Sequence, residues 1–290
     1  MMYHDTHAHL DLLLQRLGDL PGEKDLNLER GELKHMEDFE ISKHKVNDLM
    51  SKHDFVIHPT VSTENFYLVS SLFRSFSKVY FLLGSHPEIV KEKFRLENYI
   101  DIQQSLIAEL EADQNLLNRL VGIGEVGLDY HYSKDPIIIE KQKCLFEEQI
   151  SLAIKLNLPL VIHCREAFSD LFTILKSYPD IHNNFLIHCF TGDTDDLQKV
   201  LEIGGKVAFG GVATFASARD LQDAVKYCPT DSFVLETDLP FLAPAPHRSQ
   251  ICMPEMIDEI AETIANLKGL TKKETWNYSL KNTVNLFGQL

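Results

Sequence analysis

The 290-residue chain is poor in cysteine: there are five, and no two of them are spaced as Cys-x-x-Cys. An odd number without such a pair argues against a disulfide framework and against a thiolate zinc finger. Long apolar runs are also lacking, since none approaches the ~18 residues of a membrane helix. The first ten residues do not show the basic and then apolar pattern of a signal peptide. We therefore expect a soluble, cytoplasmic protein that does not contact membranes.

Positive charge is scarce as well. Lys and Arg number 28 against 43 Asp and Glu, which gives a formal net charge of −15. Proteins that coat nucleic acid normally carry an excess of Lys and Arg, so the charge argues against such a role. It leaves room for a local active site that accepts a phosphate or a chain end. No low-complexity linker divides the chain and no segment indicates a protein partner, so we expect one domain over residues 1–290.

The chain does contain a regular alternation of short apolar runs with stretches of helical periodicity. The clearest helix is predicted for residues 136–157, where Asp135 can cap the first turn and Pro136 suits the first helical position. Further helices are predicted near residues 101–119, 254–267 and 271–287. Eight strands are predicted, near residues 2–6, 54–59, 79–84, 120–125, 159–163, 184–188, 206–210 and 232–236.

Eight alternating β and α units predict the α/β class and a single (β/α)8 TIM-type barrel. In this fold the active site lies at the C-terminal ends of the strands. A doubly wound sheet is the alternative, but it would keep the first and last strands apart. The interval after the first strand is unusually long. Residues 36–50 can form the first barrel helix, which leaves 11–34 as a long loop on the catalytic face, either solvated or a partial lid over the substrate.

Six residues of metal-binding types each follow an apolar run. They are His7, His9, Glu125, His163, His188 and Asp238. If the runs are barrel strands, the six side chains meet at one end of the barrel. His7 and His9 are two residues apart, so both imidazoles face the same way on an extended strand. Imidazole is the commonest metal ligand, and a carboxylate that ends an apolar strand needs a compensating partner, which a metal supplies.

Four histidines and two carboxylates exceed the ligand set of one tetrahedral zinc. They suit two divalent ions bridged by Glu125, with His7, His9, Glu125 and Asp238 on one ion and Glu125, His163 and His188 on the other. Two ions bring +4 and two carboxylates −2, so we expect about +2 in the pocket. Paired ions activate a water for phosphoryl displacement. Glu125 and Asp238 are the predicted catalytic residues, and Asp238 can accept the water's proton.

The types of ligand are compatible with more than one metal. Imidazole-rich ligation tolerates Zn, Mn, Ni or Co, whereas Mg prefers oxygen ligands. We expect Mg or Mn in function, with Zn, Ni or Co also acceptable in the purified protein.

Two cysteines directly follow predicted ligands. They are Cys164, after His163, and Cys189, after His188. Because neighbours on a strand face opposite sides, we expect both thiols to pack behind the site.

Longer motifs surround these residues. They are DTHAHLD (5–11), GSHPE (84–88), GEVGLDY (124–130), IHCREA (162–167), IHCFTG (187–192) and ETDLPFLAPAPHR (236–248), with Asn282 and LFG (286–288) near the end. In this order they resemble the TatD-like metal-dependent deoxyribonucleases of the amidohydrolase superfamily. The resemblance spans nearly the whole chain. It implies the same barrel, the same six metal ligands one by one, and magnesium-dependent hydrolysis of DNA, often from a 3′ end.

The resemblance also implies DNA ends or oligonucleotides as substrate. By it, His86, Arg165, His247 and Arg248 are candidates for contact with phosphate or substrate. A structural ion pair is the alternative role for Arg165. Glu236 lies two residues before Asp238, so it can point the same way and support the ligands.

One loop departs from the family pattern. After His247 and Arg248 the family usually has Gly, Lys, Arg, Asn, Glu and Pro, whereas this chain has Ser249, Gln250, Ile251, Cys252, Met253 and Pro254. Two positive charges, an amide and an acid are replaced. The change leaves the metal ligands intact and predicts weaker contact with a phosphate backbone, or a different substrate.

Three functions are compatible with these residues. The first is a two-metal phosphodiesterase that acts on DNA ends, of the 3′–5′ exonuclease type. The second is an amidohydrolase or deacylase, because the same metals can activate water toward a carbonyl. The third is a non-catalytic scaffold that kept the barrel, and the presence of all six ligands argues against it.

Overall fold

The computed structural model describes residues 2–20, 26–27, 32–33, 44–91, 93–288 and 290. An eight-stranded sheet lies at its centre, with parallel neighbours in the order β1-β4-β5-β6-β7-β8-β9-β10. The strands are β1 (Tyr3–Asp5), β4 (His53–His58), β5 (Val79–Leu82), β6 (Leu120–Asp129), β7 (Leu160–Arg165), β8 (Phe185–Ile187), β9 (Lys206–Phe209) and β10 (Phe233–Leu235). All eight predicted strands are present, and β6 continues beyond its predicted end.

Backbone hydrogen bonds join the first strand to the last. The Thr6 amide donates to the Leu235 carbonyl at 3.3 Å, and the Asp238 amide donates to the His7 carbonyl at 2.9 Å. The sheet therefore curls into a nearly closed barrel, which confirms the predicted (β/α)8 architecture and excludes the doubly wound alternative. This closure brings the residues that follow β1 beside those that follow β10.

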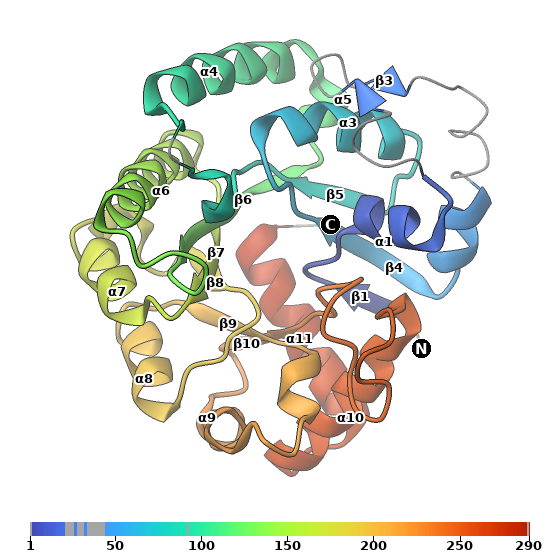
Figure 1. The fold of residues 1–290 in the computed structure, drawn as a ribbon. Coiled ribbons are helices and arrows are strands. Elements are labelled where there is room, and N and C mark those ends of the chain that lie inside the picture. Colours follow the sequence, from blue (N-terminus) through green and yellow to red (C-terminus); the bar gives the residue numbers. More distant parts are fainter. Residues whose placement is uncertain (1, 21–25, 28–31, 34–43, 92, 289) are drawn as a thin grey trace.

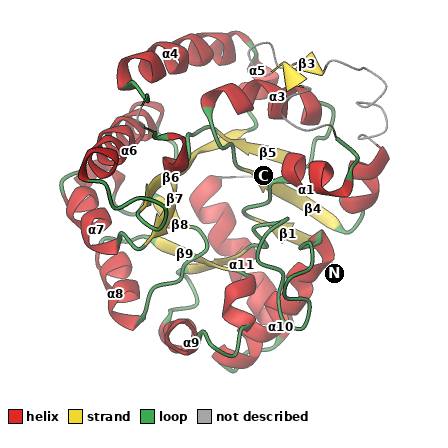
Figure 2. Ribbon diagram, viewed as in Figure 1, coloured by secondary structure: helices red, strands yellow, loops and turns green. Residues whose placement is uncertain are grey.

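Helices surround the strands (Figures 1 and 2). They are α1 (Leu10–Leu17), α3 (Thr63–Phe73), α4 (Leu96–Ala112), α5 (Gln114–Leu117), α6 (Pro136–Leu156), α7 (Phe168–Lys176), α8 (Thr194–Glu202), α9 (Arg219–Tyr227), α10 (Ile257–Lys268) and α11 (Lys272–Phe287). Two short strands, β2 (Leu26–Asn27) and β3 (Glu32–Leu33), form a separate antiparallel pair. No described helix is long and apolar enough to span a membrane.

The predicted helices are present, with one difference in division. Helix α6 begins at Pro136 as predicted, and the Asp135 carboxylate accepts the Ile137 amide at 2.8 Å. The helix predicted near 101–119 starts earlier and is interrupted at Asp113, whose carboxylate caps the short α5. The two C-terminal helices follow the predicted ranges closely.

Apolar side chains form an inner layer and an outer layer. The inner layer fills the barrel with one or two residues from most strands, namely Phe55, Ile57, Leu82, Val121, Val161, Leu186, Ala208 and Val234. Leu286 and Phe287 from the end of α11 join this layer, and Figure 1 shows α11 passing behind the ring of strands. The outer layer packs the helices on the sheet. With the interior filled, the polar mouth is left as the place for chemistry.

The interval after β1 differs from its prediction. Residues 11–34 were expected to form a loop, but α1 occupies Leu10–Leu17 and ends at Gly18, whose left-handed φ of 77° suits glycine. Its buried leucines form a helical stripe, which explains the helix. Of the first barrel helix predicted over 36–50, residues 44–49 are helical. Within 11–34 the structure also describes residues 18–20 and the paired strands β2 and β3, whereas residues 21–25, 28–31 and 34–43, and with them the proposed lid, lie outside the described residues.

Candidate metal centre

A bulge in β6 aims Glu125 into the barrel. Against β7, the register shifts between Ile123 and Val126, so the strand is locally out of step around Glu125. Gly127 follows with a φ of 134°, and a Cβ there would lie 2.0 Å from the His163 carbonyl oxygen. Glycine is therefore required for β6 to pass this close to β7. The Glu125 side chain that results is buried, with 3% of the residue exposed.

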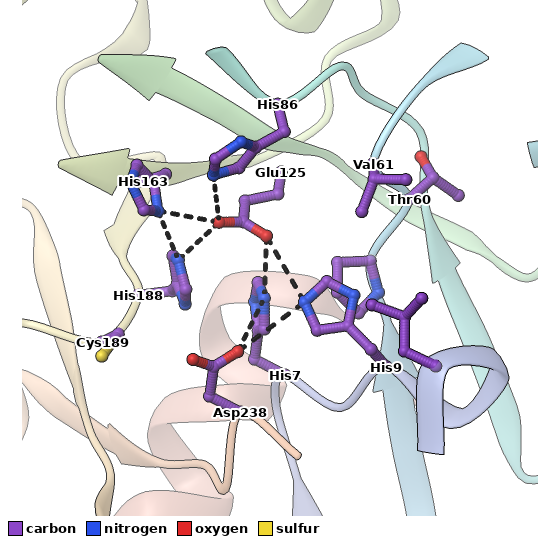
Figure 3. Close-up of polar contacts among 12 residues, drawn as sticks. His7, His9, Thr60, Val61, His86, Glu125, His163, His188, Cys189 and Asp238 are labelled. Atoms are coloured by element: carbon purple, nitrogen blue, oxygen red, sulfur yellow. Dashed lines mark hydrogen bonds and ion pairs between the residues drawn. The ribbon is translucent and has the colours of Figure 1, made fainter. Parts of the chain in front are cut away.

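The two oxygens of the Glu125 carboxylate face two groups of histidines (Figure 3). Oε2 lies 3.2 Å from Nε2 of His7 and 3.5 Å from Nε2 of His9. Oε1 lies 2.8 Å from Nε2 of His188 and 2.9 Å from Nδ1 of His163. The Glu125 carboxylate thus lies between two groups of histidines. We call His7 and His9 the proximal group, and His163 and His188 the distal group.

Asp238 completes the proximal group. Its Oδ1 lies 3.6 Å from Nε2 of His9 and 3.9 Å from Nε2 of His7. The residue has a φ of 59°, a left-handed conformation that Asp adopts more readily than most residues. The strained backbone holds the carboxylate over the cavity, where 9% of the residue is exposed.

Asp5 positions both ends of the proximal group, and the sequence did not indicate it. Its fully buried carboxylate accepts hydrogen bonds from the His7 amide at 3.1 Å, the Thr237 amide at 3.1 Å and the Thr237 hydroxyl at 2.6 Å. Burial raises the pKa of Asp5 to about 7. One side chain therefore fastens the segment carrying His7 to the segment carrying Asp238.

Carboxylates also lie beside the outer nitrogens of the distal group. Oδ2 of Asp129 lies 2.9 Å from Nε2 of His163, and Oε1 of Glu236 lies 3.7 Å from Nδ1 of His188. Such an arrangement orients an imidazole and raises its basicity as a ligand. Glu236 was expected in this role. Asp129 was missed, although it lies in the GEVGLDY motif.

Burial and mutual contact shift the protonation of the cluster. Burial alone would raise the pKa of Glu125, but the facing histidines, His188 foremost, lower it well below its usual value. Burial alone would lower the pKa of His188, but Glu125 raises it well above 6.5. His7 has its pKa lowered well below 6.5, by burial and then by His188. Burial raises the pKa of Asp238 to about 7.

This donor set fits divalent ions. Converging imidazole nitrogens and carboxylate oxygens, with outer carboxylates behind two of the rings, are typical of a metal centre. Donor atoms of His7, His9 and Asp238 lie within 4.8 Å of one another, as do donor atoms of His86, Glu125 and His163. The structure brings the six predicted ligands together, and donor atoms of His7, His188 and Glu236 also lie within 4.8 Å of one another, so the two histidine groups adjoin.

The charge of the pocket differs from the expected sum. The sequence count used Glu125 and Asp238, and Asp129 and Glu236 add two more carboxylates beside the histidines. Four formal negative charges would offset the +4 of two divalent ions, so the sum would be about zero rather than +2. An anionic substrate must therefore be attracted by positive charge from side chains outside this cluster.

The predicted substrate contacts lie in different places. A cavity of about 550 Å³ opens over the cluster, and His86 and Arg165 line it. His86 lies deep, with Nε2 at 3.3 Å from Oε1 of Glu125, so it belongs with the distal group. His247 instead pairs with Glu259 at 2.9 Å, and Arg248 lies over the Phe215 ring at 4.4 Å. Neither of these two lines the cavity.

Two further expectations changed. Cys189 contributes to the cavity lining, so the prediction that it packs behind the site is wrong. Cys164 borders the same cavity but is buried and packs with the core layer outside the strands, as predicted. Cys189 faces the cavity because its φ of 41° breaks the strand alternation. The atypical loop does not line the cavity either. Cys252 is fully buried, and Ile251 and Met253 pack on the core, so the family's charged residues are replaced by packing ones.

The model of the family described as TatD related DNase matches residues 4–288. The chain belongs to this family. The match confirms the resemblance of the motifs and makes the protein a metal-dependent hydrolase of the TatD family, with its candidate metal-binding residues at the mouth of the barrel.

Named relatives agree with this placement. An uncharacterized metal-dependent hydrolase of Bacillus subtilis, YabD, is 36% identical over 212 residues, which cover 72% of this chain and 77% of the relative. A second from Escherichia coli, YcfH, is 29% identical over 99% of this chain and 96% of its own. The crystal structure of YjjV, a TatD homologue from Escherichia coli, superposes with a TM-score of 0.79 at 25% identity, covering 99% of this chain and 98% of YjjV.

Proposed function

We propose that this TatD-family hydrolase is a deoxyribonuclease that removes nucleotides from DNA ends, in the 3′ to 5′ direction. The observation that supports it best is the division of one histidine cluster by the two oxygens of Glu125. A pair of ion sites sharing one carboxylate is the arrangement used for in-line displacement at phosphorus. The family description points to the same chemistry.

The ligands divide between two ions. His7, His9, Glu125 and Asp238 would hold the first, and Glu125, His163 and His188 the second. We propose Mg or Mn as the working metal, and the imidazole-rich set also accepts Zn, Ni or Co. When bound, such ions lower the pKa of water and neutralise charge on the phosphate.

Asp238 handles the proton in this scheme. Its carboxylate is buried beside the proximal histidines yet reaches the cavity. The water oxygen bonds to phosphorus, the bond from phosphorus to the 3′ oxygen breaks, and Asp238 takes the water's proton and returns it to the leaving oxygen. The products are a nucleoside 5′-monophosphate and a DNA strand shortened by one nucleotide.

The deciding experiment is a cleavage ladder from 5′-labelled single-stranded DNA with Mg, Mn or Zn added. The expected result is a metal-dependent ladder that shortens one nucleotide at a time. Asp238→Asn, which keeps the size of the side chain, should remove it. Protein shown to carry two ions that leaves DNA intact but hydrolyses acyl compounds would contradict the proposal and assign the centre to carbonyl hydrolysis.

A further inference from the structure

Tyr132 is an exposed aromatic residue at the mouth of the metal cavity. It lies in the connection between β6 and α6, lines the cavity, and is 68% exposed. Tyr is enriched at interfaces, and burying an aromatic ring against a flat partner is favourable, so an exposed ring that borders a cavity is a candidate for ligand contact. Tyr132 is not one of the predicted metal ligands, so binding of a metal does not explain its exposed position.

Two neighbours fix the orientation of the Tyr132 ring. The Arg165 guanidinium lies 5.3 Å from the ring centroid and donates a hydrogen bond to the Tyr132 hydroxyl at 3.3 Å. The His131 ring meets it edge-on, with centroids 4.9 Å apart and planes at 83°. The ring is thus held in place while most of its surface remains open.

Arg165 is the cation nearest the chemistry. It follows His163 by two residues on β7, so both side chains stand on the same side of the strand. Among the described residues that line the cavity, it alone is Lys or Arg. No described carboxylate forms an ion pair with it, which argues against a purely structural salt bridge. Because four carboxylates would offset the charge of two divalent ions, and Glu88 adds a further carboxylate at the rim, Arg165 is the one Lys or Arg among the described lining residues that can contact a phosphate.

We propose that Tyr132 and Arg165 form a nucleobase subsite, in which the terminal base of the substrate stacks on Tyr132 while Arg165 contacts its phosphate. The proposal rests on the proposed function and names what that function selects: a phosphate ester that carries a planar base. Base–aromatic stacking tolerates every base, so the subsite reads the presence of a base and not its identity. The cavity of about 550 Å³ suits a chain end and not a duplex.

The test measures binding of two probes to the manganese-loaded protein by titration calorimetry. The probes are thymidine 5′-monophosphate and deoxyribose 5-phosphate, which carries a hydroxyl at C1 in place of the base. The variants are Tyr132→Leu, which removes the ring, and Tyr132→Phe, which keeps it. Tyr227→Leu is the matched control, because Tyr227 is 57% exposed on α9 and does not line the cavity.

The wild type should bind the nucleotide about tenfold more tightly than the sugar phosphate, in the range known for base–aromatic stacking. Tyr132→Leu should abolish this preference by weakening the nucleotide alone, whereas Tyr132→Phe and Tyr227→Leu should keep it. Equal binding of both probes by the wild type, or equal weakening of both by Tyr132→Leu, would overturn the subsite.

A parallel hydrolysis assay separates this proposal from the proposed function. It compares a normal oligonucleotide with one whose 3′-terminal residue lacks a base. Hydrolysis of both at equal rates by wild type and Tyr132→Leu would support the nuclease and overturn the subsite. If the wild type prefers the nucleotide in the binding assay but cleaves neither DNA, the subsite stands and the nuclease fails.

Discussion

At the mouth of the barrel the buried histidines face carboxylates, whereas near its base they face aromatic rings. His7 and His188 at the mouth both point a nitrogen at Glu125. His4 on β1 stacks on Phe55, with centroids 5.5 Å apart, and His53 at the start of β4 meets the Tyr3 ring edge-on at 5.5 Å. The two groups are similarly buried.

The difference lies in the partners and not in the residue type. Burial is the leading cause lowering the pKa of His4 to about 3 and of His53 to about 4. At the mouth, a carboxylate can outweigh the same burial, as the raised pKa of His188 demonstrates. A buried histidine becomes a plausible ligand when acidic groups are placed around it, and otherwise behaves as a neutral aromatic ring.

Of the changes considered, removal of Glu125 should have the largest effect, because it takes away the carboxylate that the histidines at the mouth share. Glu125→Ala deprives both histidine groups of their shared carboxylate, so we expect hydrolysis to fall to the protein-free background and metal content to drop. Elemental analysis and the cleavage assay measure both effects. Glu88→Gln is the control, because Glu88 is an exposed carboxylate on the rim of the same cavity. Full metal content and turnover in Glu125→Ala would show that Glu125 does not bridge.

Asp129 tests whether the outer carboxylates matter. Asp129→Asn keeps the shape but removes the charge behind His163, and loss of such a partner typically weakens metal affinity by about 10–100-fold. Activity should therefore need more metal and recover at high metal concentration. Metal titration of activity measures the shift, with Asp180→Asn on the surface as control. An unchanged titration curve would mean that His163 is oriented without Asp129.

The base histidines should appear in the pH dependence of stability. Their folded pKa values lie below the unfolded value of about 6.5, so their stabilisation is complete above that pH and is lost as the pH falls toward 4 and 3. His53→Leu cannot take up a proton. Between pH 8 and 5, the metal-free variant should lose about 2 kcal/mol less unfolding free energy than the wild type.

Denaturant unfolding at the two pH values measures this difference. The histidines and carboxylates at the mouth are the same in both proteins, so their contribution cancels when the two losses are compared. His44→Gln, at an exposed histidine, should follow the wild type. A parallel loss in wild type and His53→Leu would show that His53 is protonated as readily in the folded chain as in the unfolded one.

The smallest effect is expected in the loop at residues 249–253, which contains neither the histidines at the mouth nor those near the base. Ser249 has a φ of 75°, a left-handed conformation, at the position where the family usually has glycine. Ser249→Gly should raise unfolding free energy by about 0.5–1 kcal/mol and leave metal content unchanged. Thermal unfolding measures the gain. A fall in metal content would mean that this loop supports the mouth after all.

The sequence predicted the barrel and the central ligands because both leave a local signal. Each strand is a short apolar run, and Glu125, His163 and His188 each stand where such a run was expected to end. The bulge in β6 is not visible in this pattern. The predicted strand stopped at residue 125, whereas β6 continues to Asp129, so that carboxylate was not placed beside the site.

Other parts of the site depend on distant pairing. Asp5 acts through Thr237, 232 residues away, and nothing around Asp5 in the sequence marks that partner. The reverse error arose in the loop after β10, where motif resemblance put His247 and Arg248 near the substrate. In the structure their side chains contact Glu259 and Phe215 instead. The contacts of a loop side chain depend on the residues that pack beside it in space, and a sequence motif does not specify them.

The link between Asp5 and Thr237 has a consequence during protein synthesis. A ribosome makes the chain from its N-terminus, so His7 and His9 emerge long before Asp238. The distal histidines and Glu125 can gather earlier, but the proximal group waits for β10 to close the ring. A partly made chain would therefore lack the residue proposed to move the proton. Hydrolytic activity would begin only when nearly the whole barrel has been translated.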